Sequence, residues 1–206
     1  YAVSFNSNGS TGGSVPGPGP QTKTHGIDVS DLSNSGSLVK TGYTFGGWNT
    51  AADGSGTSYA ASATYGVDAA VTLYAQWTGN SLTVTYDSRE GSPAAGGSLS
   101  TTSGGVVASA PDEPTRAGYV FTGWFTATGG GTAITFPYTH SQTTSFTLYA
   151  QWTIRTYAVS FNSNGSTGGS VPGPGPQTKT HGIDVSDLSN SGSLVKTGYT
   201  FGGWNT

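Results

Sequence analysis

Apolar residues alternate with small polar ones over short stretches of the chain, and these stretches recur. Tyr1, Val3 and Phe5 take every second position of the opening segment, and residues 82–86 and 157–161 repeat this spacing. Because successive side chains of a strand point to opposite faces, the alternation predicts strands with one buried face. Only residues 27–32 have the spacing of a short helical turn, which is marginal without packing. The pattern therefore predicts a mostly β fold with little helix.

Two longer motifs follow each opener in a fixed order, and we name them GYxFxGW and TLYAQW after their letters. They occupy residues 42–48 and 72–77, then 118–124 and 147–152, and GYxFxGW returns at 198–204. The chain thus divides into repeat A (1–78), repeat B (79–153) and a half-repeat (154–206). The half-repeat is an incomplete second repeat A, because residues 157–206 copy residues 1–50 letter for letter. Since the joints are only about four residues long, we expect neighbouring repeats to stack semi-rigidly into an elongated array.

The GYxFxGW motif predicts a strand that carries aromatic rings. In a regular strand Tyr43 and Phe45 would point one way and Trp48 the other, and Trp48 would end the strand and pack on the TLYAQW strand. Glycine in a strand often marks a bulge or a close approach. We interpret the recurring rings as core and not as a carbohydrate-stacking platform. The predicted core motif is Tyr43, Phe45, Trp48, Leu73 and Trp77 in repeat A, and Tyr119, Phe121, Trp124, Leu148 and Trp152 in repeat B.

A cation precedes each GYxFxGW motif at the same distance. Lys40 and Arg116 both lie two residues before the first glycine. A cation beside an aromatic ring adds roughly 0.5–1 kcal/mol at an exposed site. We therefore expect a cation–π contact in each repeat.

Composition narrows the classes of function. The chain has 206 residues with no Cys and no Met, only 8% of its residues are charged, and its formal net charge is −3. Nucleic-acid binding needs clustered Lys and Arg, so no nucleic-acid partner is expected. No apolar run is long enough for a membrane-spanning helix, so we expect no membrane insertion in this segment.

Candidate catalytic and metal-binding residues are sparse. Enzymes need titratable groups that converge, and ten acidic residues with three His form no such arrangement in the sequence, so we predict no enzyme and no cofactor. Calcium prefers six to eight oxygen ligands, and the acidic residues are too scattered for a loop site. The oxygen ligands considered are Asp28, Asp31, Asp53, Asp87 and Glu90. An isopeptide cross-link requires a buried lysine, for which Lys23 and Lys40 look like poor candidates.

The order of alternating opener, GYxFxGW and TLYAQW resembles the Listeria–Bacteroides repeat family, the B-repeats of internalin-type surface proteins. Besides the core motif above, Gly47, Tyr74 and Ala75 match in repeat A, and Gly123, Tyr149 and Ala150 match in repeat B. The resemblance implies small β-grasp-like domains, used in tandem as spacer and adhesive stalk in secreted or wall-anchored bacterial proteins, without catalytic residues. The chain departs from the pattern where 38–40 of repeat A replaces the Pro-x-Arg at 114–116 of repeat B.

We therefore expect a structural repeat segment of an extracellular bacterial surface fibre or stalk. The alternative is an adhesin-type module that binds a glycan or a host protein through exposed aromatic residues. Candidates outside the shared motifs are Tyr59, Tyr65, Phe125, Phe136 and Tyr138.

The half-repeat lacks the TLYAQW strand against which its GYxFxGW motif should pack. Half a domain buries too little surface to be stable alone, and its unpaired strand presents an open edge. We expect copies of the protein to complete it, either from a neighbouring chain in a polymer or from the next copy in a longer filament.

Overall fold

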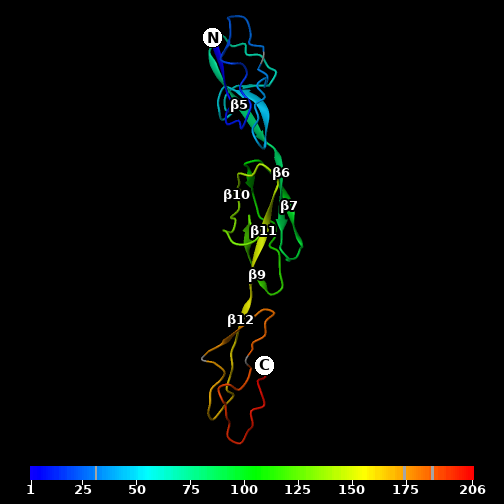
Figure 1. Cartoon of the computed structure of the whole chain (residues 1–206), viewed down its shortest axis with the longest axis vertical. Coiled ribbons are helices and arrows are strands. Elements are labelled where there is room, and N and C mark those ends of the chain that lie inside the picture. Colours follow the sequence, from blue (N-terminus) through cyan, green and yellow to red (C-terminus); the bar gives the residue numbers. More distant parts are fainter. Residues whose placement is uncertain (31, 174, 187) are drawn as a thin grey trace. The chain divides into compact units, whose positions relative to one another are not determined.

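The computed structural model describes residues 1–30, 32–173, 175–186 and 188–206, and Figure 1 traces their strands. The described residues form strands and turns, with no helix among them. The predicted mostly β fold is therefore confirmed. The helical turn expected at residues 27–32 is wrong for the part described: Ile27 and Val29 form isolated bridges with Thr24 and Tyr65, and Asp31 lies outside the described residues.

Repeat A folds into a five-stranded sheet in the order β2-β1-β5-β3-β4. The long strand β5, which contains the TLYAQW motif, is central: it pairs parallel with β1 and antiparallel with β3. This parallel pairing of the first and last strands fits the predicted β-grasp topology, which stays a prediction. The strands are β1 (Ala2–Asn6), β2 (Gln21–Thr22), β3 (Tyr43–Asn49), β4 (Ser58–Tyr59) and β5 (Val71–Gly79).

The core of repeat A lies on one face of this sheet. Val3, Leu73 and Ala75 are fully buried, as the alternation of β1 and β5 predicts. Val29, Leu32 and Leu38 from the connections also belong to the core, and Phe5, Phe45 and Trp77 pack against it. A small set of strands thus buries its apolar face under loops, not under a helix.

A bulge in β3 overturns one expectation about the GYxFxGW motif. Phe45 pairs with Trp77 and Gly47 with Gln76, so Gly46 is an extra residue. An extra residue shifts the alternation by one position. The prediction that Phe45 and Trp48 point to opposite faces is therefore wrong, and their rings are in contact.

Repeat B contains a four-stranded sheet in the order β7-β6-β11-β9 and a two-stranded sheet of β8 and β10. The antiparallel β9–β11 pair repeats the β3–β5 pair, including a register shift between Gln151 and Trp152. The strands are β6 (Ser81–Asp87), β7 (Ala95–Thr102), β8 (Val106–Val107), β9 (Tyr119–Phe125), β10 (Tyr138–Thr139) and β11 (Phe146–Ile154).

The half-repeat has one strand pair, β12 (Thr156–Val159) with β13 (Gln177–Thr180). Its GYxFxGW motif at residues 198–204 forms no strand, although the same letters form β3 in repeat A. Because the two sequences are identical, local propensity cannot explain the difference. What differs is the pairing: β3 is bonded to β5, whereas residues 199–205 pair with no described strand.

The chain divides into two compact units. One comprises Tyr1–Thr85, Gly97–Ala110 and Thr135–Thr147, and the other comprises Tyr86–Gly96, Pro111–Ile134 and Leu148–Thr206. The first unit contains all of repeat A, and the second contains the whole half-repeat.

Candidate functional site

Trp48 anchors the aromatic cluster of repeat A. Its side chain is 1% exposed, and its indole Nε1 donates a hydrogen bond to the carbonyl oxygen of Leu32 at 2.7 Å. Its ring meets those of Phe5 and Phe45 edge to face, with centroids 4.8 and 5.3 Å apart. Edge-to-face pairs at such distances add to the stabilisation from buried area.

A second tryptophan closes the cluster from β5. Trp77 meets Phe45 edge to face at 5.6 Å, and its Nε1 donates to the carbonyl oxygen of Ser7 at 3.1 Å. Repeat B has the same arrangement, in which Trp152 meets Phe121 at 5.5 Å and donates to Ser88 at 3.0 Å. Trp77 and Trp152 are thus held by one scheme. The buried Nε1 of Trp124, by contrast, has no hydrogen-bond partner among the described residues, although that of its counterpart Trp48 has one.

The predicted core residues differ in how deeply they lie. Trp48, Leu73, Trp124 and Leu148 are buried, and Tyr43, Phe45, Trp77, Tyr119, Phe121 and Trp152 are partly buried. Tyr86, which is absent from the predicted core motif, is also buried, and its ring meets Trp124 at 4.9 Å. Tyr86 ends the alternating opener of repeat B, at the place that Phe5 has in repeat A, and this equivalence is the signal that identifies it.

The expected cation–π contacts are present. Lys40 Nζ lies 4.7 Å from the ring centroid of Tyr43, and Arg116 Cζ lies 3.9 Å from that of Tyr119. Arg116 also forms an ion pair with Glu90. These exposed contacts cover the tyrosine rings at the start of β3 and β9.

The aromatic residues considered for ligand binding do not form an exposed set. Tyr65 is 2% exposed and Phe125 is 8% exposed, so the expectation that they lie on the surface is wrong. Tyr59, Phe136 and Tyr138 are partly buried. Burial raises the pKa of Tyr65, whose hydroxyl group donates to the carbonyl oxygen of Ala69 at 3.1 Å.

Lys23 is buried and forms an ion pair with the partly exposed Asp68, which the sequence does not predict. Its side chain is 0% exposed, and its Nζ lies 2.6 Å from Asp68 Oδ1 and 2.8 Å from the carbonyl oxygen of Thr24. The other carboxylate oxygen of Asp68 lies 2.5 Å from His25 Nδ1. The expectation that Lys23 is a poor candidate for burial is therefore wrong, because residues 45 positions apart meet only in the fold.

The charge state of this pair argues against an isopeptide. The hydrogen bond from Lys23 holds the pKa of Asp68 below its usual range. Amide formation needs a neutral amine and a carboxyl group that can lose water, whereas this geometry favours an ammonium and a carboxylate. The ion pair therefore links the segment after β2 to the segment before β5.

The remaining acidic residues considered as metal ligands serve local roles. Asp53 accepts hydrogen bonds from the hydroxyl and amide of Ser55, which hold the pKa of Asp53 below its usual range. Asp87 accepts from the amide of Arg89. In the described part of the chain, no three His, Cys, Asp or Glu residues lie close enough to hold a metal ion. His140 is buried beside Thr101, and burial lowers its pKa.

The joints between repeats are held by one hydrogen-bond scheme. The amide of Asn80 donates to Gly42 at 2.9 Å, and its carbonyl accepts from the amide of Ser103 at 2.9 Å. At the second joint, the amide of Arg155 donates to Gly118 at 2.8 Å, and its carbonyl accepts from His181 at 2.9 Å. Each central joint residue is thus bonded both to the repeat before it and to the repeat after it.

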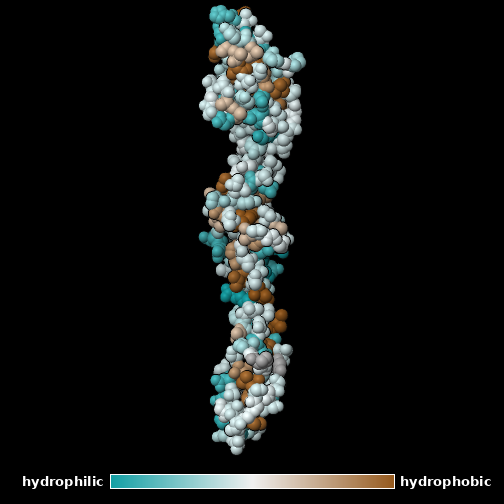
Figure 2. Space-filling model, turned by 90° about the vertical axis from the view of Figure 1, so that its left-hand side faces the viewer, coloured by the Kyte–Doolittle hydropathy of each residue, from teal (hydrophilic) through white to brown (hydrophobic). Residues whose placement is uncertain are grey.

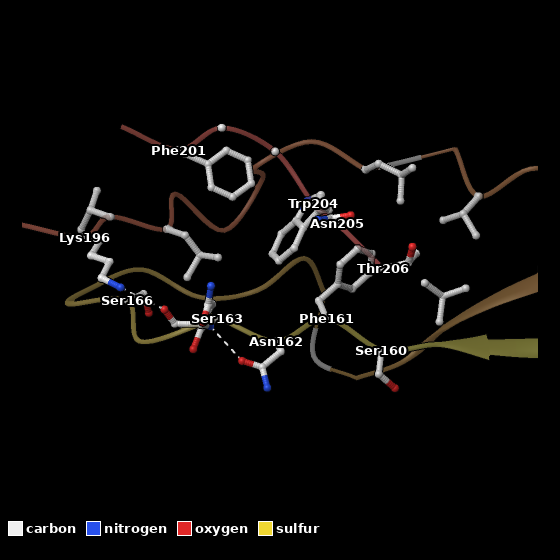
Figure 3. Close-up of a pocket in the computed structure, with 18 of the residues that line it drawn as sticks. Ser160, Phe161, Asn162, Ser163, Ser166, Lys196, Phe201, Trp204, Asn205 and Thr206 are labelled. Carbon is white, nitrogen blue, oxygen red and sulfur yellow. Dashed lines mark hydrogen bonds between the residues drawn. The ribbon is translucent and has the colours of Figure 1, made fainter. Parts of the chain in front are cut away.

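The half-repeat contains a groove of about 1310 Å³. Figure 3 shows the ring of Trp204 in this groove between those of Phe161 and Phe201, with centroid distances of 4.8 and 5.3 Å. In repeat A the ring of Phe45, the counterpart of Phe201, also meets the ring of Trp77 from β5. Figure 2 shows hydrophobic residues at the surface of this part of the chain, which Figure 1 colours orange and red.

Trp204 lacks the anchor that holds its counterpart Trp48. Among the described residues its buried Nε1 has no hydrogen-bond partner, although the same atom of Trp48 bonds Leu32. Leu188, the counterpart of Leu32, is 55% exposed, whereas Leu32 is fully buried. The aromatic cluster is therefore assembled in the half-repeat, but Leu188 does not pack over it as Leu32 does over Trp48.

No described helix is long and apolar enough to cross a membrane.

The chain matches the family described as the Listeria-Bacteroides repeat domain over residues 1–76, 83–151 and 157–206. It is also similar to individual curated proteins. A candidate Gly-rich membrane protein of Evansella cellulosilytica is 36% identical over 168 residues, which cover 81% of this chain and 19% of that protein.

Two further relatives match shorter parts of the chain. Internalin H of Listeria monocytogenes is 36% identical over 94 residues, or 46% of this chain and 15% of that protein. A second candidate membrane protein of Evansella cellulosilytica is 33% identical over 136 residues, or 65% of this chain and 19% of that protein. The chain thus spans between 15% and 19% of the length of these relatives.

Proposed function

The chain belongs to the Listeria-Bacteroides repeat domain family, and on this basis we propose that it is a structural repeat segment of a bacterial cell-surface protein. In this role the repeats act as a stalk that sets the distance between an anchor and a functional part elsewhere in a longer protein. Two of the relatives are named as membrane proteins and one as an internalin, which supports a location at the cell surface.

The hydrogen bonds at the joints carry this proposal. A spacer has to transmit position, so its joints must resist bending. Asn80 and Arg155 are each bonded to the repeats on both sides, and the joints are too short to act as flexible tethers. The same two backbone hydrogen bonds form at both joints although the side chains there differ, so they depend on the backbone of the repeat and not on particular side chains.

Other classes of function have less support. The cluster of Lys23, Asp68 and His25 is an ion pair built around a fully buried lysine side chain, in which Asp68 bonds both cationic partners. We therefore propose no enzymatic activity. Binding of glycans or a host protein has less support, because the aromatic residues suggested for it are buried or partly buried. It stays a prediction.

Small-angle X-ray scattering on this chain and on chains with one or two added 156-residue periods tests the stalk. Each added repeat should lengthen the particle by roughly 30 Å, by the size scaling of compact domains. The maximum dimension should therefore grow linearly with repeat number. A dimension that grows only with the cube root of mass, as for a globule, would contradict the proposal.

A further inference from the structure

His140 is a buried histidine of repeat B that follows directly after β10. Its side chain is 6% exposed, and its ring centroid lies 4.8 Å from that of Phe146 and 6.0 Å from that of Tyr138. Its Nε2 lies 3.2 Å from Thr101 Oγ1, and its Nδ1 accepts a hydrogen bond from the backbone amide of Gln142 at 3.2 Å. Both ring nitrogens therefore have a partner inside the repeat.

These bonds fix the ring as the neutral tautomer that carries its hydrogen on Nε2. The amide of Gln142 can only donate, so Nδ1 must present a lone pair. The hydroxyl group of Thr101 donates to the carbonyl oxygen of Val106 at 3.1 Å, so the hydroxyl oxygen accepts from Nε2. A second ring proton would sit on Nδ1 and face the amide hydrogen of Gln142. Protonation of His140 must therefore break this bond.

The sequence around the ring provides no negative charge. The residues that bond or contact the ring belong to β7, β8, β10 and β11, or follow β10, and residues 91–111 and 117–154, which contain these strands, have no Asp, Glu, Lys or Arg. Tyr138 beside the ring is titratable, but a phenol carries no charge in acid. Lys40 of repeat A, which lies 4.7 Å from the ring centroid of Tyr43, is positive as well. A charge on the imidazole would thus be buried without a partner.

Burial without a counter-charge lowers the pKa of His140. A group whose pKa is lowered in the fold contributes stability that is fully present above its ordinary pKa, about 6.5 for histidine. This contribution is lost as the pH falls through the lower folded value. The bonds around His140 are therefore intact in neutral solution and are lost in acid.

His140 connects two turns of repeat B. Its own amide donates to the carbonyl oxygen of Gly105 at 3.1 Å. The carbonyl oxygen of Gln142, the residue bonded to its ring, accepts from the amide of Gly104 at 3.0 Å. The segment after β10 is thus tied to the turn between β7 and β8, and the bond to the ring holds Gln142 in place between them.

Repeat A contacts both of these segments. A Cβ atom added to Gly42 would lie 2.5 Å from the Cβ of Thr143 and 2.9 Å from the Oγ of Ser103. A Cβ atom added to Gly104 would lie 2.4 Å from the hydroxyl oxygen of Tyr43. Because the backbones approach so closely, a shift of either segment of repeat B would disturb its contact with repeat A.

Repeat A itself has no imidazole at this place. Tyr65 is the counterpart of His140, since both lie seven residues before the first threonine of the TLYAQW motif, Thr72 or Thr147. Tyr65 is also buried, but its hydroxyl group donates to the carbonyl oxygen of Ala69 and does not gain a proton in acid. The acid-sensitive group is therefore a feature of repeat B.

We propose that His140 is a pH-sensitive support of the joint between repeats A and B. When its ring takes up a proton from solution, Nδ1 no longer accepts from Gln142, the two segments that contact repeat A separate, and the joint loses stiffness. Release of the proton restores the bond, so the change is reversible and needs no other reactant. This inference rests on the proposed structural role, to which it adds control of stiffness by pH.

Nuclear magnetic resonance of the intact chain tests the protonation state. The ring nitrogen shifts of His140, assigned by their loss in His140→Asn, should show a hydrogen on Nε2 alone at about pH 7.5 and on both nitrogens at about pH 4.5. A hydrogen on Nδ1 alone at the higher pH would overturn the proposal, and so would a ring that stays neutral at the lower pH.

Pulsed electron paramagnetic resonance tests the joint. The chain has no cysteine, so one cysteine introduced in each repeat places a pair of spin labels. The distance distribution should be narrow at about pH 7.5 and broad at about pH 4.5 in wild type. His140→Asn should keep it narrow at both, because the side-chain oxygen of Asn can accept from Gln142 but does not titrate. His181→Asn, which removes a different and exposed imidazole, should leave the broadening unchanged.

His140→Tyr introduces the residue that repeat A has at this place, and it serves as a second variant that does not titrate in acid if His140→Asn fails to fold. A distribution that stays narrow at about pH 4.5 in wild type would overturn the proposal, and so would broadening that persists without His140. A distribution that is already broad at about pH 7.5 would contradict the stiff stalk and the switch with it. Failure of the switch alone is therefore distinguishable from failure of the stalk.

Discussion

Gly47 faces the carbonyl oxygen of Tyr59 so closely that an added Cβ atom would lie 2.4 Å from that oxygen. The two residues belong to β3 and β4, which pair next to this point. Gly47 also has a φ of +110°, which side-chain-bearing residues rarely adopt. The glycine of the GYxFxGW motif therefore serves a tight approach of two backbones beside the bulge.

Gly47→Ala should destabilise repeat A by about 2–4 kcal/mol, because it adds backbone strain and a clash with a backbone atom. The matched control is Gly203→Ala, which has the same sequence context and a φ of +114°, but no atom within 4 Å of the added Cβ. It should cost about 1 kcal/mol or less, since the segment forms no strand and can relax. Denaturant unfolding followed by hydrogen exchange in each repeat measures both, and equal costs would contradict the clash.

The indole of Trp48 provides a second matched pair. Trp48→Ala removes a buried ring and leaves the carbonyl oxygen of Leu32 without its donor, so repeat A should lose about 3–5 kcal/mol. Trp204→Ala should cost far less, about 1 kcal/mol, because the ring is partly exposed and its Nε1 bonds no described residue. Thermal unfolding followed by tryptophan fluorescence reports on both. Similar losses would show that the half-repeat is as well packed as repeat A.

Residues 1–50 and 157–206 have the same sequence but differ in structure, which shows how much of the fold the sequence alone predicts. The alternation of residues 1–5 and the TLYAQW motif predict β1 and β5 because their side chains follow a regular strand. The bulge at Gly46 was not predictable in position, since glycine permits a bulge without requiring one. The strand at 43–49 and its absence at 199–205 depend on a partner, which no local pattern encodes.

The site divides in the same way. The aromatic cluster and the cation–π contacts involve residues that are close in sequence or belong to recurring motifs, so the sequence predicts them. The Lys23–Asp68 pair joins residues 45 positions apart in loops without periodicity, so nothing in the sequence connects them.

The Lys23–Asp68 pair predicts a pH dependence for repeat A. The pKa of Asp68 is lowered in the fold, so its contribution to stability is fully present above its ordinary pKa of about 3.9 and is lost as the pH falls through the lower folded value. The free energy of unfolding of wild type and Asp68→Asn should therefore differ at pH 7 and converge in acid. A constant difference across this pH range would contradict the linkage.

Substitutions at the two ends of the pair should have unequal effects. Asp68→Asn leaves a fully buried ammonium without its counter-charge, whereas Lys23→Met fills the same space with an apolar chain and leaves a carboxylate that water can reach. Leaving a buried charge without its partner is costly, whereas a carboxylate that stays in contact with water loses little when its partner is removed. Asp68→Asn should thus lower the midpoint of thermal unfolding more than Lys23→Met does. The opposite order would show that the ion pair itself, and not the cost of a lone buried charge, dominates.

The bonds of Asn80 predict that the joint between repeats A and B is sensitive to length. A Gly-Ser insertion after Asn80 separates the donor to Gly42 from the chain that follows, so the hydrogen bonds on the two sides of the joint can no longer act together. Distances between spin labels in the two repeats, measured by pulsed electron paramagnetic resonance, should change from a narrow to a broad distribution. The same insertion in the Pro/Gly loop at residues 16–20, which lies outside every strand, should leave the distribution narrow. Two results would contradict a joint stiffened by these bonds. One is a broad distance distribution in the wild type, and the other is a distribution that stays narrow after the insertion behind Asn80.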